Sequence, residues 1–354
     1  MKTALVYDRV NKFGGAERVL LALHKIWPNS PLYTSVYNPK TSPWASVFDI
    51  RTSFMQKIPF AKSHHELFPM CTPIAFEQFD FSEYDVVVSV SSAESKNIIT
   101  TPKTLHICYC LTPTRYLWSG TNLYPKSFFR SLLSINLRMI DQVASHRPDK
   151  YIAISKTVAL RIKKYYRQDS EIIYPPIDTD KFVLSKQSKD FFLLVSRLVP
   201  YKKVDLAINV FNKTGKKLVI VGSGSEEKHL KGIANKNIEF IKDLTDFDLL
   251  SYYQNCCALI FPSVEDFGLV SPEAQACGKP VIVNRRGGAS ETINEGETGL
   301  TFETEQELID IINKFNTRNF DAEKCRKNAL KFNIKKFKSD FKNFVEKAYE
   351  EKQS

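Results

Sequence analysis

Short apolar runs alternate with longer amphipathic segments along almost the whole chain, most regularly in its second half. The runs there predict strands at residues 191–196, 218–221, 238–241, 258–261 and 281–283. Helix-length segments separate them at residues 203–212, 225–234, 245–255 and 272–277. Near-continuous apolar strands that alternate with helices indicate a parallel sheet covered on both faces.

The first half follows the same pattern with longer interruptions. It predicts strands at residues 4–7, 85–90 and 105–110, and a helix over 16–26. The fold class expected is therefore α/β, with two Rossmann-like, doubly wound domains. In such sheets ligands bind at the carboxyl ends of the strands, so the loops that follow the strands are the places to look for chemistry.

A pair of prolines, Pro175-Pro176, marks the expected division between the two domains. Adjacent prolines stiffen a connection and are excluded from a central strand. The predicted domains are residues 1–173 and 174–333, followed by a separate helix over 334–354. That last segment is basic and amphipathic, with an apolar face made of Phe337, Phe341, Phe344 and Ala348.

Composition places the chain among globular proteins, with 354 residues, 43% apolar and 25% charged. No apolar run approaches the roughly 20 residues of a membrane-spanning helix. The first apolar run meets Asp8, so it is too short for the core of a signal peptide. Seven cysteines without metal-ligand or disulfide spacing favour a reduced, cytoplasmic setting.

The chain carries 50 Lys and Arg against 39 Asp and Glu, a net charge of +11. Residues 1–180 hold 22 basic and 15 acidic side chains, so +7 of the excess lies there. Such an excess suits nucleic acid, an anionic membrane surface or a phosphorylated small molecule, and a plain solvated surface also explains it. Because no run of five like charges occurs, no nucleic-acid partner is expected.

The most specific motif runs through residues 261–274, directly after a predicted strand. Ser271 is expected to be the N-cap of the next helix and Pro272 its first residue. Glu265 then lies on the strand-to-helix loop and Glu273 in the first helical turn. Gly268 allows a ligand to approach the backbone closely. Complementing the helix dipole is the structural alternative for Glu273.

Cations and glycines follow other predicted strands. Arg197 and Lys202 lie five residues apart on one loop. Two cations there can hold a diphosphate and stabilise the negative charge that develops as it leaves. Gly14-Gly15 and Gly222-Ser223-Gly224 also follow strands, but neither completes a dinucleotide-binding fingerprint. An NAD enzyme is therefore disfavoured. The sequence suggests neither a metal site nor a cofactor, since its two Asp-x-Asp matches lie in the linker and at a helix start.

Taken together, these residues resemble the GT-B retaining glycosyltransferases of family 4, and the resemblance covers nearly the whole chain. It rests on Glu265-x7-Glu273, Ser196-Arg197 with Lys202, Gly14-Gly15-Ala16-Glu17 and Gly287-Gly288. Segments of the first half narrow it to bacterial O-antigen and exopolysaccharide mannosyltransferases: 53–54, 77–80, 106–113, 115–118 and 173–178.

The resemblance implies metal-independent transfer from a nucleotide sugar bound between an acceptor-binding first domain and a donor-binding second domain. It implies that Glu273 binds the ribose and that Glu265 faces the sugar, while the leaving phosphate takes the acceptor's proton. The catalytic residues it implies are Arg197, Lys202 and Glu265. The donor-binding residues it implies are Gly14, Gly15, Ser196, Arg197, Lys202, Gly222, Glu265, Phe267, Gly268, Leu269 and Glu273. The final helix is expected to pack on the first domain.

One position departs from the family pattern. Many relatives carry a histidine where this chain has Leu111. His106, Thr112 and Arg115 are the remaining candidates on the sugar or acceptor side, although His106 at a strand start also suits simple packing. The aromatic-rich segment 54–81 either docks on an anionic membrane face near a lipid-linked acceptor or packs as an excursion of the first domain.

The function expected is transfer of a hexose, mannose from GDP-mannose first, to a lipid-linked or oligosaccharide acceptor of a bacterial surface polysaccharide. The expected location is cytoplasmic, with peripheral association with the inner membrane face as an option. UDP- or dTDP-sugar donors, a nucleotide-sugar 2-epimerase and a non-catalytic sugar-nucleotide-binding protein stay open as alternatives. A glycan phosphorylase is disfavoured because it needs a longer chain.

Overall fold

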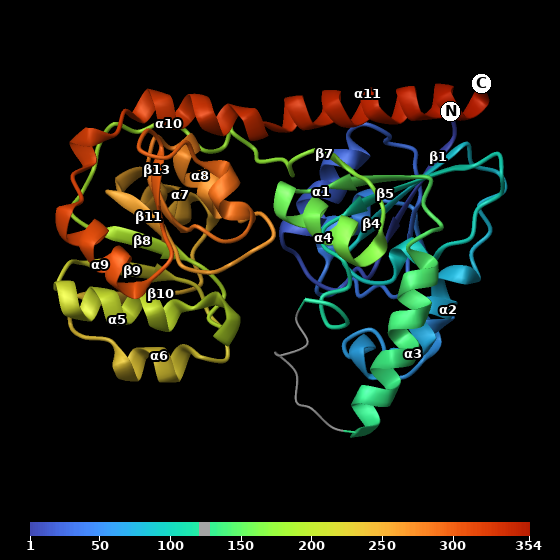
Figure 1. Cartoon of the computed structure of the whole chain (residues 1–354), viewed down its shortest axis with the longest axis horizontal. Coiled ribbons are helices and arrows are strands. Elements are labelled where there is room, and N and C mark those ends of the chain that lie inside the picture. The colour runs from blue at the N-terminus through green and yellow to red at the C-terminus, as the bar shows by residue number, and fades with distance from the viewer. Residues whose placement is uncertain (120–127) are drawn as a thin grey trace. The chain divides into compact units, whose positions relative to one another are not determined.

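The chain folds into two compact units, shown in Figure 1. Unit 1 comprises Met1–Pro176 together with Phe337–Ser354, and unit 2 comprises Ile177–Lys336. The computed structural model describes residues 1–119 and 128–354, and for residues 128–132 only the backbone. Because unit 1 is built from two separate stretches, its final helix comes from the far end of the chain.

Unit 1 is built on a seven-stranded, fully parallel sheet. Its strand order is β3-β2-β1-β4-β5-β6-β7, so the order reverses between β1 and β4. The strands are β1 Thr3–Tyr7, β2 Leu32–Thr34, β3 Ile50–Thr52, β4 Val86–Ser91, β5 Leu105–Cys110, β6 Lys150–Ala153 and β7 Glu171–Ile172. The helices are α1 Gly15–His24, α2 Cys71–Glu77, α3 Phe128–Ala144, α4 Lys156–Tyr166 and α11 Ile334–Gln353, the last from Phe337 on.

Unit 2 repeats this plan with a six-stranded parallel sheet in the order β10-β9-β8-β11-β12-β13. The strands are β8 Phe192–Val195, β9 Leu218–Val221, β10 Ile238–Ile241, β11 Ala258–Phe261, β12 Val281–Asn284 and β13 Gly299–Phe302. The helices are α5 Val204–Thr214, α6 Glu227–Ile233, α7 Asp246–Asn255, α8 Val270–Ala276, α9 Glu305–Lys314 and α10 Ala322–Ala329.

Short 3-10 helices occur in many of the connections. They are η1 Pro43–Val47, η2 Phe54–Lys57, η3 His65–Leu67, η4 Ser95–Asn97, η6 Pro200–Lys202, η7 Gly288–Thr292, η8 Thr317–Asn319 and η9 Leu330–Phe332. Several of them follow strands directly, so they shape the loops at the carboxyl edges of the two sheets.

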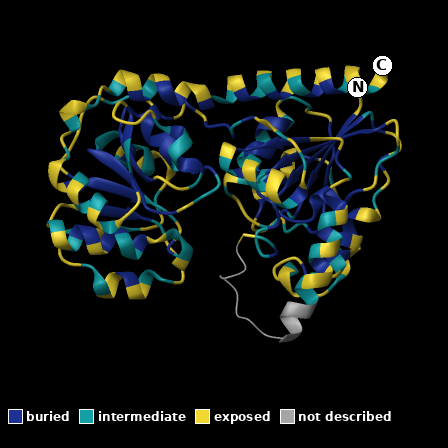
Figure 2. Ribbon diagram, in the orientation of Figure 1, coloured by how far each residue is buried: buried dark blue, intermediate teal, exposed yellow. Residues whose placement is uncertain are grey.

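The central strands form because their residues are apolar on both faces and both faces are covered. Every residue of β1, β4, β9 and β11 is buried, and Figure 2 shows buried strands at the centre of each unit. This confirms the predicted fold class, two Rossmann-like α/β units with parallel sheets. All seven cysteines are free thiols, and six of them are buried. Across residues 1–119 and 128–354, no helix is long and apolar enough to span a bilayer.

Helix α11 packs on unit 1 through one apolar face. Phe341 lies between Tyr109 of β5 and Trp27, at ring-centroid distances of 5.6 and 6.1 Å. At the far end of the helix, Lys352 Nζ donates to Asp149 Oδ2 at 2.8 Å. The buried residues of α11 are Phe337, Phe341, Val345 and Ala348. The sequence pattern placed Phe344 on this face, but the helical period turns Val345 inward and leaves Phe344 half-buried.

Candidate functional site

The loops at the carboxyl edge of the unit 2 sheet are packed backbone to backbone at glycines. A Cβ on Gly222, after β9, would lie 1.9 Å from the Ser196 carbonyl oxygen after β8. A Cβ on Gly288, after β12, would lie 2.0 Å from the Asp266 carbonyl oxygen after β11. No side chain fits at either distance. Gly222 therefore has a packing role, and the donor contact that the resemblance implies for it stays a prediction.

Lys202 and Glu265 meet at this edge. Lys202 ends η6 after β8, Glu265 follows β11, and these two strands are neighbours where the strand order reverses. Lys202 Nζ donates to Glu265 Oε1, and Ser263 Oγ donates to the same oxygen at 2.9 Å. Both ion-pair partners are largely shielded, with 12% and 19% of their side chains exposed. The geometry thus presents a cation and a carboxylate side by side at the strand-order reversal.

Glu273 is buried on α8 and held by a tyrosine. Tyr253 of α7 donates its hydroxyl to Glu273 Oε2 at 2.8 Å. The helix begins at Val270 with Leu269 at its N-cap, so the expected cap at Ser271 is wrong. The hydroxyl of Ser271 instead lies 2.5 Å from that of Thr292. Glu273 nevertheless lies in the first turn of α8.

The remaining donor-side candidates of unit 2 lie on the loops that follow β8 and β11. Arg197 is exposed, and its guanidinium donates to the Tyr201 hydroxyl. Gly268 has a φ of +86°, and a Cβ there would lie 2.9 Å from Phe261. Phe267 is buried and packs edge-on against Phe332 at 5.5 Å. Ser196 and Leu269 are half-buried. The strained conformation at Gly268 thus requires glycine independently of any ligand.

In unit 1, Gly14 is the N-cap of α1 and Gly15 is its first residue. The first turn holds Glu17, which is buried and accepts a hydrogen bond from the Tyr7 hydroxyl at 2.6 Å. A Cβ on Gly14 would lie 3.2 Å from Glu17 Oε2. The glycine pair therefore lies, as predicted, at the start of the helix that follows β1, and a buried carboxylate holds this helix start in place.

Sequence reasoning missed a group of buried carboxylates at the same edge of unit 1. Asp8 follows β1 and accepts hydrogen bonds at 2.8 Å from the backbone N–H of Ser92 and of Ser95. Glu94 follows β4 and accepts from the Tyr116 hydroxyl at 2.5 Å. Burial, and after it the negative charge of Asp8, raises the pKa of Glu94 to about 7.

A buried ion pair supports the next loop. Lys96 Nζ donates to Asp141 Oδ1 of α3 at 2.5 Å, and both side chains are at most 4% exposed. Asp141 also accepts from Thr114 Oγ1 and Trp118 Nε1, each at 2.7 Å. These bonds anchor the loop after β5 to α3. Lys96 lies in the mostly polar stretch 91–97, so nothing in the sequence singled it out as a buried lysine.

The three acceptor-side candidates do not lie together. His106 is the second residue of β5, near its amino end, and is fully buried with Nε2 2.9 Å from Ser89 Oγ. Burial lowers its pKa to about 3. Thr112 and Arg115 follow β5 at the carboxyl end, and Thr112 Oγ1 accepts from Arg161 at 3.3 Å. His106 is therefore withdrawn from the candidate site, because a strand's amino end lies at the opposite edge of the sheet.

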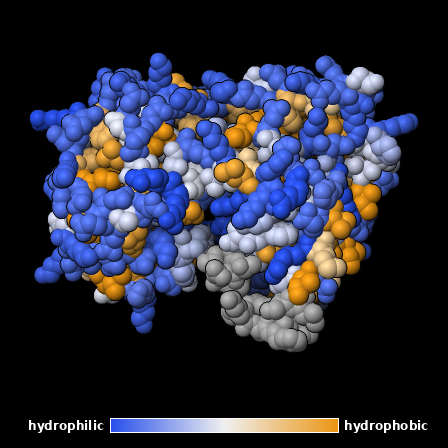
Figure 3. Space-filling view, viewed as in Figure 1, coloured by the Kyte–Doolittle hydropathy of each residue, from blue (hydrophilic) through white to orange (hydrophobic). Residues whose placement is uncertain are grey.

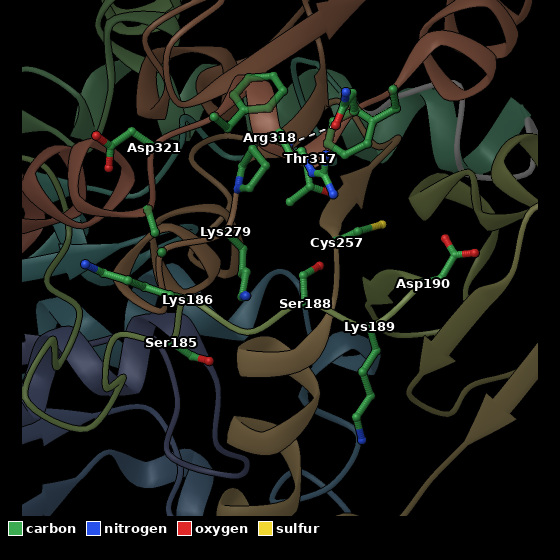
Figure 4. A pocket seen from close by; sticks show the side chains of 16 residues that line it. Ser185, Lys186, Ser188, Lys189, Asp190, Cys257, Lys279, Thr317, Arg318 and Asp321 are labelled. Carbon is green, nitrogen blue, oxygen red and sulfur yellow. Dashed lines mark hydrogen bonds between the residues drawn. The ribbon is translucent and has the colours of Figure 1, made fainter.

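Unit 2 also holds a cavity of about 690 Å³ (Figure 4). Its lining includes Asp190, Cys257 and Lys279, which directly precede or closely precede β8, β11 and β12. It is therefore at the amino edge of the sheet, and none of the candidate residues lines it. Among residues 1–119 and 128–354, no group of three His, Cys, Asp or Glu side chains is arranged to hold a metal ion.

Curated relatives of the chain include several sugar transferases. An uncharacterized glycosyltransferase of Methanocaldococcus jannaschii is 28% identical over 62% of this chain and 64% of its own length. Alpha-1,3/1,6-mannosyltransferase ALG2 of Dictyostelium discoideum is 25% identical over 76% and 77%. O-antigen chain mannosyltransferase RfbU of Salmonella typhimurium is 25% identical over 46% and 48%. The chain thus spans just under two thirds of the archaeal relative and about half of RfbU.

The chain shares its fold with a solved structure, and part of it matches a family model. Anabaena HepE, crystallised with UDP and glucose, superposes with a TM-score of 0.72 at 18% identity, over 98% of this chain and 100% of that one. This likeness extends over both units and shows the GT-B type of fold. Residues 176–332 match the model of the family described as glycosyl transferases group 1. Unit 2 therefore matches the glycosyl transferases group 1 family over most of its length.

Proposed function

We propose that the chain is a retaining glycosyltransferase of family 4 that transfers mannose from GDP-mannose to a lipid-linked or oligosaccharide acceptor in surface polysaccharide synthesis. The observation that carries the proposal is the meeting of Lys202 and Glu265 at the strand-order reversal of unit 2. The mannosyltransferases ALG2 and RfbU among the relatives support mannose. A UDP-sugar donor is the second candidate, supported by UDP and glucose in the HepE structure.

In this mechanism, Lys202 exchanges its bond to Glu265 for the donor diphosphate, and Arg197 leaves Tyr201 to do the same. Both cations then stabilise negative charge that grows as the nucleoside diphosphate departs. Glu265, released from Lys202, accepts hydrogen bonds from the donor sugar. Glu273, held in place by Tyr253, binds the ribose hydroxyls through its carboxylate. The departing phosphate takes the proton of the acceptor hydroxyl, so no protein nucleophile is required.

A melting-temperature panel with GDP-, UDP- and dTDP-sugars tests the donor. The true donor raises the melting temperature most, because it binds the folded state. Glu273→Ala should abolish that shift, and Tyr253→Phe, which keeps the carboxylate, should weaken it partly. Glu239→Gln, an exposed glutamate of β10, is the matched control and should behave like the wild type. An unchanged shift in Glu273→Ala would contradict the assigned site.

Turnover separates catalysis from binding. If Arg197 stabilises developing charge, Arg197→Ala lowers kcat by at least about 100-fold, the scale of one removed oxyanion donor, while the donor KM changes little. A variant with normal kcat and a raised donor KM would assign Arg197 to ground-state binding alone.

We further propose that unit 1 associates peripherally with the anionic membrane face that holds the acceptor. Hydrophobic side chains gather over α2 and α3 in Figure 3. Ile135, Met139 and Val143 of α3 recur every four residues and are 50–64% exposed. Phe60 and Leu67, exposed by 76% and 67%, lie in the segment between β3 and α2.

Co-sedimentation with anionic vesicles tests this association. Wild type should bind at low ionic strength and bind less as salt rises. Met139→Glu should reduce binding, whereas Phe247→Glu, on an exposed residue of α7 in unit 2, should not. Equal pelleting with and without vesicles would contradict the membrane association. It would not contradict the proposed sugar transfer.

A further inference from the structure

A small cavity in unit 1 is lined by basic and neutral polar side chains. Its volume is about 260 Å³, and its walls come from the loop after β1, the loop after β2 and residues 62–65 downstream of β3. No aspartate or glutamate lines it among the residues that the structure describes. The lining residues that the argument uses are Arg9, Asn11, Lys12, Thr41, Lys62 and His65.

Hydrogen bonds between different loops hold these walls in place. Thr41 Oγ1 donates to the Asn11 carbonyl at 2.8 Å, and Asn11 Nδ2 donates to the Lys62 carbonyl at 3.3 Å. Trp44 Nε1 donates to the Lys12 carbonyl at 2.8 Å. Each bond joins two loops, so the cavity is built into the fold.

Two of the cations that line this cavity have no carboxylate close to them. In the described part of the chain, neither Arg9 nor Lys62 has a carboxylate within 4.0 Å. Burial, and after it the charge of Arg9, lowers the pKa of His65 to about 4; Lys12 acts in the same direction, against Glu66 and Asp8. His65 Nδ1 is buried without a hydrogen bond, although Glu66 Oε2 lies 3.4 Å away.

We infer that this pocket binds a phosphate group, and that the group belongs to a phosphate- or diphosphate-bearing acceptor. Arg9 can hold two phosphate oxygens at once, and Lys12 and Lys62 add point charges. At about 260 Å³, the cavity is smaller than the roughly 300–1,000 Å³ of sites for drug-sized ligands, so it admits the phosphates and leaves sugar or lipid outside. The inference rests on the proposed function and extends it from donor to acceptor.

Titration with inorganic pyrophosphate at low ionic strength tests the pocket directly. Wild type should bind, and Arg9→Gln and Lys62→Gln should each weaken binding at least tenfold. Lys40→Gln, an exposed cation on the loop after β2 outside the lining, should stay within twofold. The same titration with Lys202→Gln separates any binding by the donor loop of unit 2. Equal affinity of Arg9→Gln and wild type for pyrophosphate would overturn the inference that this pocket binds phosphate.

Steady-state kinetics with two acceptors identifies the source of the phosphate. For a sugar linked to a prenyl diphosphate, Arg9→Gln should raise the acceptor KM at least tenfold and leave kcat and the donor KM unchanged. For the same sugar on a neutral alkyl chain, the variant should match wild type. Loss of anionic-vesicle binding without a change in acceptor KM would assign the pocket to a lipid headgroup and overturn the inference.

These outcomes are distinguishable from failure of the proposed function. A wild-type protein that neither binds nor hydrolyses any nucleotide sugar overturns the proposed function. Normal donor binding and hydrolysis, combined with an Arg9→Gln variant that treats both acceptors as wild type does, overturns only the pocket.

Discussion

Glu94 is a carboxyl group in surroundings that favour its neutral form. It is buried beside Asp8, and both the burial and that neighbouring negative charge raise its pKa to about 7. The Tyr116 hydrogen bond, Lys96 and Arg9 act in the opposite direction and do not cancel the rise. The folded protein therefore holds a proton here that the unfolded chain releases near its ordinary pKa of 4.5.

This proton makes stability depend on pH in a defined direction. The contribution of protonated Glu94 is fully present below pH 4.5 and is lost as pH rises through about 7. Glu94→Gln stays neutral, so relative to wild type it should be more stable at pH 8 than at pH 5, by a difference on the order of 3 kcal/mol. Urea unfolding at both values measures this. Glu171→Gln, on an exposed strand residue, should show the same relative stability at both.

Whether the position of a single residue can be predicted from the sequence depends on how close its partners lie in the sequence. Glu265 and Glu273 were predictable because their loop and helix follow directly from the sequence around them. The Lys96–Asp141 pair was not, because its members are 45 positions apart and only the fold brings them together. The correction at His106 has the same origin, since a strand's two ends face opposite edges of the sheet.

At the scale of elements, the unit 2 loops are rigid because their backbones touch at glycines. The β11 loop that carries Glu265 and the β12 loop that starts at Arg285 are locked together at Gly288, whose N–H also donates to the Glu265 carbonyl at 2.7 Å. The position of the Glu265 carboxylate therefore depends on the glycine at position 288. The paired glycines at 287–288 were visible in the sequence, but their contact partner was not.

Gly288→Ala should displace that loop, because the new Cβ would lie 2.0 Å from the Asp266 carbonyl oxygen. We expect a lower melting temperature and at least a tenfold weaker donor affinity. Gly232→Ala in α6 is the control: nothing lies within 4 Å of its Cβ, and alanine in a helix is favoured by up to about 1 kcal/mol. Unchanged donor affinity in Gly288→Ala would mean that the loop adapts.

The hydrophobic pattern predicted the longer strands and missed several of the short ones. The long apolar runs that became β4, β5, β9 and β11 were predicted to within a residue or two. Strands β2, β3, β6, β7 and β13 were missed. For β2, β3 and β7 the reason is length, because two or three residues carry too little periodicity to register. Strands β6 and β13 have four residues each, of which only Tyr151, Ile152 and Ala153 in β6 and Gly299 and Phe302 in β13 are buried, so their patterns are less continuous than those of the central strands.

At the scale of the whole molecule, the two units have separate cores, and α11 belongs to the core of unit 1. Phe341 is fully buried against Tyr109 and Trp27, all three in unit 1. Phe211 is fully buried in the core of unit 2, 5.2 Å from Phe192. Removing either ring costs about 3–5 kcal/mol, the usual effect of a large-to-small change in a core.

These two substitutions should therefore destabilise different parts of the chain. In hydrogen exchange, Phe341→Ala should speed the exchange of β1 and β5 and leave β8 and β9 as in wild type. Phe211→Ala should do the reverse, because local opening follows the unit that lost its packing. Residues 337–354 then contribute to the stability of unit 1, although they are the last residues of the chain. Equal loss of protection in both units from either substitution would mean that the molecule unfolds as one cooperative body.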